Sequence, residues 1–211
     1  MSVIRMRPLL VSAAIALAFT TSRLSFAVPT HALGDASTSS FSQGGTVAQT
    51  ARGWEFQVNA TNVQIVQLGA NIWTDGTALT LSLWDDNSHT LLAQTSVTSS
   101  AHNWVFANLG SPVSLTSGGL YSVVGWANVT NTWYQLNNTP PAAFTPTGTI
   151  QYTQVLFDNG AGPNTFPTGT TSGQYGVTDI GYQIAPEPST FVLILAALNG
   201  HALLILRRRL A

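Results

Sequence analysis

Apolar and polar residues alternate along the middle of the chain from Gly53 onward. Apolar side chains occupy every second position over 54–58 and again over 79–83. A period of two puts successive side chains on opposite faces of a β-strand. Between residues 40 and 185 we find no convincing helical period of 3.6, so the pattern predicts an all-β domain.

Shorter runs of the same kind follow, separated by turn residues such as Ser111-Pro112 and Asp158-Asn159-Gly160. The parity of the apolar positions changes near Ile65 and Val66, which predicts a β-bulge. Many short strands at this spacing favour an antiparallel β-sandwich of jelly-roll type. Further strands are predicted at 63–72, 91–97, 104–107, 113–115, 120–126, 132–136, 150–157 and 177–184.

The N-terminus has the pattern of a secretory signal peptide. Arg5 and Arg7 precede an apolar stretch over 8–20, and small residues stand at Ser25 and Ala27. We expect the export machinery to recognise this segment and signal peptidase to cleave the chain after Ala27.

The C-terminal tail has three parts in a fixed order. It begins with Pro186, Glu187 and Pro188, continues with an almost wholly apolar stretch over 191–206, and ends with Arg207, Arg208 and Arg209. The apolar stretch predicts a helix in the membrane, and the positive-inside rule keeps the arginines cytoplasmic. The basic N-terminus faces the same side, so both ends place the intervening domain outside.

This tail resembles the PEP-CTERM sorting signal of Gram-negative bacteria that make exopolysaccharide. Members carry a Pro-Glu-Pro motif, a hydrophobic helix and a terminal arginine cluster, and the resemblance implies cleavage near the motif by a membrane protease, an exosortase. Asn199 and His201 interrupt the apolar helix, and polar groups are costly near the bilayer centre. They favour a transient span over the alternative, a permanent single-helix anchor.

A second resemblance covers roughly residues 50–136. The runs that carry it include Gly53-Trp54-Glu55-Phe56, Val66-Gln67-Leu68-Gly69, Leu83-Trp84-Asp85 and Gly119-Leu120-Tyr121-Ser122-Val123. They are similar to an uncharacterised domain of bacterial extracellular proteins with interchangeable C-terminal anchors, the choice-of-anchor type. Relatives usually have a longer acidic loop where this chain has only 70–78. The resemblance implies a β-sandwich and an extracellular role, and it implies no activity.

Together these patterns divide the chain into four segments. They are a signal peptide (1–27), a flexible lead-in with an edge strand near Phe41 (28–52), a β-sandwich domain (53–185) and a sorting segment (186–211).

Charge is sparse and unevenly placed. Charged residues make up 7% of the chain, and all the cations are arginines. Residues 28–185 contain one cation, Arg52, and seven acidic residues, so this region carries a net charge of −6. Nucleic-acid binding requires clustered cations, so we exclude it. The chain has no cysteine and therefore no disulfide.

The sequence offers no catalytic constellation. His31, His89 and His102 stand apart from one another and from any nucleophile motif. Asp85 and Asp86 are adjacent, and neighbouring strand residues point to opposite faces, which disfavours a shared cleft for glycoside hydrolysis. We therefore predict a protein that is not an enzyme, with a secreted hydrolase as a remote alternative.

Two kinds of ligand remain. Asp85, Asp86 and Asn87 are candidate ligands for a structural calcium ion, although ordinary turn chemistry explains the same residues. Exposed aromatic rings could stack on sugars, with packing in the core as the alternative; the candidate contacts are Trp126, Trp133 and Tyr134. The predicted function is that of a non-enzymatic exported cell-surface or matrix protein, with an exopolysaccharide-binding module as the alternative.

Overall fold

The structure is a computed structural model that describes residues 28–33, 41–47, 49–72, 74–128, 131–136, 148–160, 162–171 and 178–185. For residues 41–47, 131–136 and 171 it describes the backbone alone. Ala27, the sorting motif and the terminal arginines lie outside these residues. Within the described part, no helix has the length and apolar character needed to cross a membrane.

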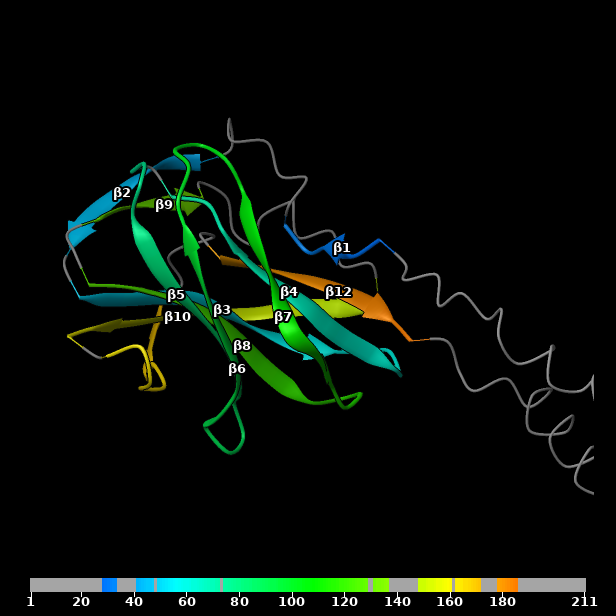
Figure 1. Cartoon of the computed structure of the whole chain (residues 1–211). Coiled ribbons are helices and arrows are strands. Elements are labelled where there is room, and N and C mark those ends of the chain that lie inside the picture. Colours follow the sequence, from blue (N-terminus) through cyan, green and yellow to red (C-terminus); the bar gives the residue numbers. More distant parts are fainter. Residues whose placement is uncertain are drawn as a thin grey trace, which may run out of the picture.

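The described residues form strands and no helix, as the alternating pattern predicts (Figure 1). The strands are β1 (Thr30–His31), β2 (Phe41–Val47), β3 (Thr50–Val58), β4 (Val63–Ala70), β5 (Ala78–Asp85), β6 (Thr90–Thr98), β7 (Val105–Ser114), β8 (Leu120–Ala127), β9 (Asn131–Leu136), β10 (Ile150–Asn159), β11 (Gly169–Thr171) and β12 (Thr178–Ile184).

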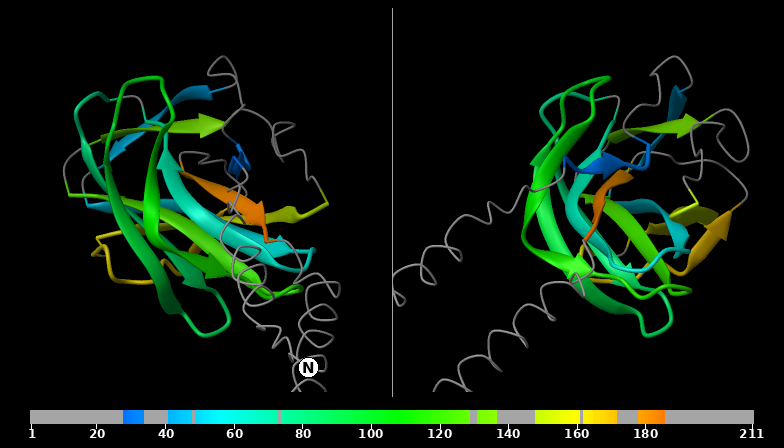
Figure 2. Two further views of the ribbon diagram at one scale, coloured as in Figure 1. Left: turned by 45° about the vertical axis from the view of Figure 1, so that its right-hand side comes forward. Right: turned by 90° about the vertical axis from the view of Figure 1, so that its right-hand side faces the viewer.

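Two antiparallel sheets make up most of the domain. One has the strand order β1-β12-β4-β7, and the other has the order β11-β10-β3-β8-β5-β6. Strands β2 and β9 pair separately. The two large sheets form the two layers seen in Figures 1 and 2, an arrangement consistent with a β-sandwich. The predicted all-β class is therefore confirmed.

The core lies between these two sheets. Phe56 of β3, Leu81 of β5 and Ile180 of β12 are all fully buried there, and each such side chain contributes about 1.5–3 kcal/mol relative to exposure. A hydrogen bond also links the two sheets, since the Trp54 indole N–H of β3 donates to the Thr178 carbonyl of β12 at 2.7 Å.

The bulge predicted near Ile65 and Val66 is confirmed. Ile65 pairs with Tyr182 and Val113, and the ladders resume at Gln67, so Val66 has no partner in the registers of β4 with β12 and β7. The burial pattern changes parity at the same point.

Some boundaries differ from the sequence prediction. The turn expected at Ser111-Pro112 is wrong, because β7 runs unbroken through it. Opposite Val66 the register of β7 with β4 is irregular, and Ser111-Pro112 lies in this irregular stretch. Proline is tolerated there because an edge strand needs no backbone N–H for a ladder hydrogen bond at that position. Strand β3 begins at Thr50 rather than Gly53, since residues 50–54 are all buried and show no alternation. Strands β1 and β2 lie within the stretch assigned to the lead-in.

Candidate functional site

The candidate site lies on the outer face of the six-stranded sheet. Because Trp54 and Phe56 point into the core, Glu55 between them points outward. On this outer face Phe166, from the segment that follows β10, packs against a small buried cluster of Ala51, Trp84 and Val124.

Hydrogen bonds hold this segment over the sheet. The Gln94 amide of β6 donates to the Pro163 carbonyl at 3.2 Å and to the Asn164 side-chain oxygen at 3.0 Å. The Ser82 hydroxyl of β5 also donates to the Pro163 carbonyl, at 3.4 Å. The segment therefore covers one part of the outer face and forms a wall beside the rest.

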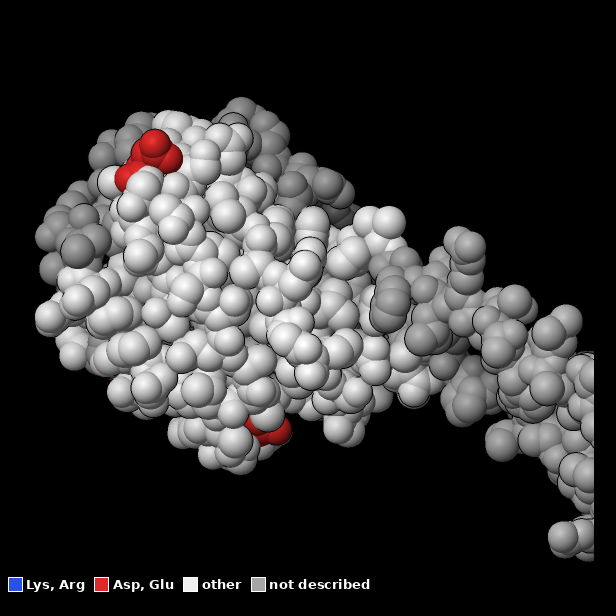
Figure 3. Space-filling view, in the orientation of Figure 1, with Lys and Arg blue, Asp and Glu red and all other residues white. Residues whose placement is uncertain are grey.

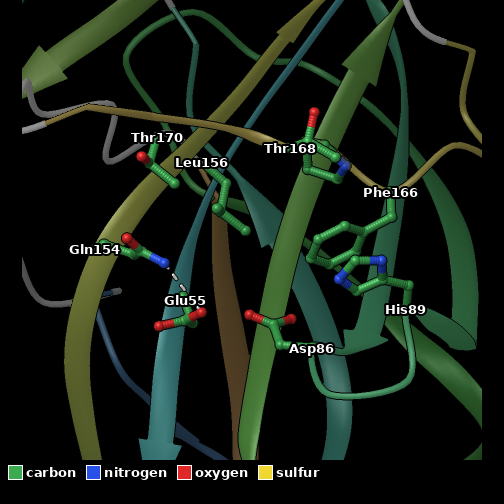
Figure 4. Close-up of a pocket in the computed structure, with 9 residues that line it drawn as sticks. Glu55, Asp86, His89, Gln154, Leu156, Phe166, Thr168 and Thr170 are labelled. Carbon is green, nitrogen blue, oxygen red and sulfur yellow. Dashed lines mark hydrogen bonds between the residues drawn. The ribbon is translucent and has the colours of Figure 1, made fainter.

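An open pocket of about 210 Å³ lies against this wall (Figure 4). Its lining combines carboxyl, amide and hydroxyl groups with apolar and aromatic surfaces. The lining residues are Glu55, Asp86, His89, Gln154, Leu156, Phe166, Pro167, Thr168 and Thr170.

Two carboxyl groups face each other in the pocket, Glu55 from β3 and Asp86 from the turn after β5 (Figure 4). The Ser122 hydroxyl lies 2.6 Å from both oxygens of Asp86. The pKa of Asp86 is raised to about 7, mainly by burial and also by the neighbouring Glu55, although the hydrogen bond from Ser122 opposes the rise. Near neutral pH the Asp86 carboxyl group is therefore partly protonated.

A β-bulge supplies the remaining partners of Glu55. Tyr152 of β10 pairs with Phe56 and Gln154 pairs with Glu55, so Thr153 is the extra residue. As a result both Thr153 and Gln154 reach the same carboxylate. The Thr153 hydroxyl donates to one oxygen of Glu55, and the Gln154 amide donates to the other at 3.1 Å.

An aromatic stack forms another side of the pocket. The His89 ring lies parallel to the Phe166 ring, with centroids 4.1 Å apart and planes 10° apart (Figure 4). Phe166 in turn meets Trp84 edge to face at 5.8 Å. His89 has a φ of 53° in the turn between β5 and β6, a left-handed conformation that histidine adopts more readily than most residues.

The three candidate calcium ligands do not converge. The Asp85 carboxylate accepts the backbone N–H groups of Asn87 and Ser88, both at 3.0 Å, and so closes its own turn. The Asp86 carboxylate instead approaches Ser122. Among the residues that the structure describes, no three or more His, Asp or Glu side chains gather where a metal ion could bind.

The candidate glycan contacts are only partly described. Trp126 is half-buried and packs on the same cluster as Phe166, but it is not among the residues that line the pocket. Trp133 and Tyr134 lie on β9, whose side chains are outside the described set.

The sequence analysis missed the pairing of Glu55 with Asp86, which come from separate strands. It considered Asp86 only beside its neighbour Asp85. One signal was present, since Glu55 is an acidic residue inside a strongly alternating run and must face away from the core.

Comparison with known proteins adds no family to this description. The sequence matches none of the family models against which it was scanned, and no curated protein matches it. The function must therefore be argued from the chemistry of the site.

Proposed function

We propose that this is an exported, non-enzymatic protein of the cell envelope or extracellular matrix that binds carbohydrate in the Glu55–Asp86 pocket. The observation that carries the binding proposal is the composition of the pocket. A carboxyl pair and an amide line it together with the stacked rings of His89 and Phe166.

A sugar presents the complementary chemistry. Its hydroxyl groups need donors and acceptors in fixed positions, and the apolar face of its ring packs on aromatic surfaces. Glu55 and Asp86 would accept hydroxyl protons, the Gln154 amide is a donor at the same edge, and Phe166 provides a ring face beside them. Trp126, which packs on the same buried cluster as Phe166, offers a further aromatic surface for a longer chain.

The expected ligand is a neutral oligosaccharide rather than a uronic acid. No arginine lines the pocket, and residues 28–185 carry a net charge of −6. A third carboxylate, brought by a uronic acid next to Glu55 and Asp86, would meet like charge in a partly buried site.

Binding has more support than hydrolysis. Glycosidases hold their two carboxyl groups about 5–5.5 Å apart, or about 6.5–9.5 Å apart, so that the scissile bond fits between them. Here both carboxyl groups are hydrogen-bonded within the protein, Glu55 to Thr153 and Gln154 and Asp86 to Ser122, which suits fixed binding groups better than a nucleophile or a general acid. A secreted hydrolase is therefore the weaker alternative.

The delivery of the protein rests on its two end segments. The signal peptide would direct export, and the tail from Pro186 to Arg209 would be recognised by an exosortase while its apolar stretch spans the membrane. Exopolysaccharide outside the cell would then be the nearest source of carbohydrate.

We also propose that the sandwich is a jelly roll. Eight strands support this by their nested pairing, in which the first pairs with the last and the middle two form a hairpin. These pairs are β1 with β12, β3 with β8, β4 with β7 and β5 with β6. Strands β10 and β11 extend the sheet beside β3 and provide one side of the pocket.

Calorimetric titration of the full-length protein with neutral oligosaccharides tests the binding proposal. We expect the wild type to bind, and Phe166→Ala to weaken binding about tenfold or more because the sugar loses its stacking surface. Phe106→Ala, on the outer face of the other sheet, is the matched control and should retain binding. Absence of wild-type binding to every neutral oligosaccharide, or equal losses in the two variants, would contradict the proposal.

A further inference from the structure

The free edges of the two large sheets differ in how well they are protected against pairing with another chain. An exposed edge strand presents unpaired N–H and C=O groups, and proteins usually protect it by shortness, charge, proline or bulges. Strands β1 and β11 are edges of only two and three residues. Edge strand β7 contains Pro112 and a register irregularity.

Strand β6, the remaining edge, has little such protection. It extends over nine residues, Thr90–Thr98, and contains no charged residue and no proline. Its register with β5 is irregular only near Leu92 and continues evenly from Ala93 to Thr98. Strand β7 lies near β6 but forms no ladder with it in the described structure, so the backbone groups of β6 that face away from β5 have no ladder partner.

The face of the domain in Figure 3 carries few charged side chains. The face in Figure 3 has carboxylate side chains in two separate places and is otherwise uncharged among the residues drawn in white and colour. The side chains of β6 are mostly exposed or half-buried, and Leu91 is among the exposed large apolar residues.

We propose that two copies of this protein pair antiparallel through β6, joining their six-stranded sheets into one continuous sheet. A second copy is the partner because a two-fold axis places the uncharged strand against itself, so no charge is desolvated and the contact is self-complementary. Among the edges of the two large sheets, only β6 is long and free of proline, so the pairing is expected there. The two pockets then lie on one sheet, and a polysaccharide chain that reaches both gains avidity.

Sedimentation velocity of the full-length protein tests this pairing. We expect a dimer for the wild type and a shift toward monomer, by tenfold or more in dissociation constant, for the double variant Ser96→Lys, Thr98→Lys. Both side chains are exposed, so the fold should be retained. The matched control is Ser111→Lys on β7, which should dimerise like the wild type. A monomeric wild type, or a dimer unaffected by the two lysines, would overturn the proposal.

Cysteine cross-linking provides a second readout, because the chain contains no cysteine of its own. Single cysteines at Thr90, Gln94, Ser96 and Thr98 should give disulfide-linked dimers, with a maximum at the position nearest the two-fold axis. Ser111→Cys should give few. Stronger cross-linking at Ser111 than anywhere on β6 would place the contact on β7 and overturn the proposal.

Discussion

At the scale of single residues, Asp86 is the most informative side chain of the site. It follows the end of a hairpin strand, yet its carboxyl group is partly buried against Ser122 and lies in the same pocket as Glu55. Its pKa is raised to about 7 from an ordinary value of 3.8, mainly by burial. The folded protein therefore binds a proton that the unfolded chain releases at lower pH.

This proton makes the stability of the fold depend on pH. Between about pH 4 and pH 7 the folded state binds more protons than the unfolded state, so the free energy of unfolding should fall as pH rises through that window and level off above it. Asp86→Asn cannot ionise and should lose this decline. Urea titrations at pH 4, 5.5, 7 and 8 measure the effect.

Asp75→Asn is the control for that measurement, because Asp75 accepts only an exposed backbone N–H, from Ala101 at 3.3 Å, among the bonds described. It should keep the decline of the wild type. Parallel curves for the wild type and Asp86→Asn would show that the pKa of Asp86 is not raised in the folded protein.

At the scale of elements, strands β3 and β8 approach each other closely in the middle of the six-stranded sheet. Gly53 lies opposite Val124 in the ladder between these strands. A Cβ atom at Gly53 would lie 2.1 Å from the Val123 carbonyl oxygen, which is part of the backbone and cannot turn aside. The glycine thus allows the two central strands of the sheet to pack closely beside the pocket.

Gly53→Ala should therefore destabilise the domain by about 1–3 kcal/mol or more, as overpacking does in a filled region. Gly110→Ala is the matched control, since no atom lies within 4 Å of the added Cβ, and it should change stability by less than about 0.5 kcal/mol. Denaturant unfolding compares the two. Equal, small effects would mean that β3 and β8 can separate without cost.

Elements with a strong two-residue period could be predicted from the sequence, and short or fully buried ones could not. The bulge near Val66 is visible because a single extra residue shifts the parity of every apolar position after it. Strands β1 and β11 are too short to show a period. The site was missed because Glu55 and Asp86 meet only after β3, β5 and β8 align side by side.

At the scale of the whole molecule, the two junctions with the end segments lie next to each other. Strand β1 begins two residues after Val28, and it runs antiparallel to β12, with Thr30 opposite Tyr182. The start of β1 is therefore beside the end of β12, and Ala185 immediately precedes Pro186, the first residue of the proposed sorting motif. Such neighbouring junctions suit a domain whose two end segments both lead to one membrane.

Cleavage at both junctions can be detected directly from the mass of the mature protein. Intact-mass measurement of the protein recovered from outside the cell should give a chain that begins at Val28 and ends near Pro188. Substitution of Pro186 and Pro188 by alanine should leave the tail attached if the motif is the recognition element. A secreted wild-type chain that retains Arg207, Arg208 and Arg209 would contradict sorting through this tail.

The central claim is that carbohydrate occupies the Glu55–Asp86 pocket, and NMR chemical-shift mapping tests it most directly. Titration of the nitrogen-15-labelled protein with a neutral oligosaccharide should perturb the backbone amides of His89, Thr168 and Thr170 and the side-chain amide of Gln154. The amides of β7 on the opposite sheet should not move. Perturbations confined to β7, or none at saturating sugar, would contradict the account.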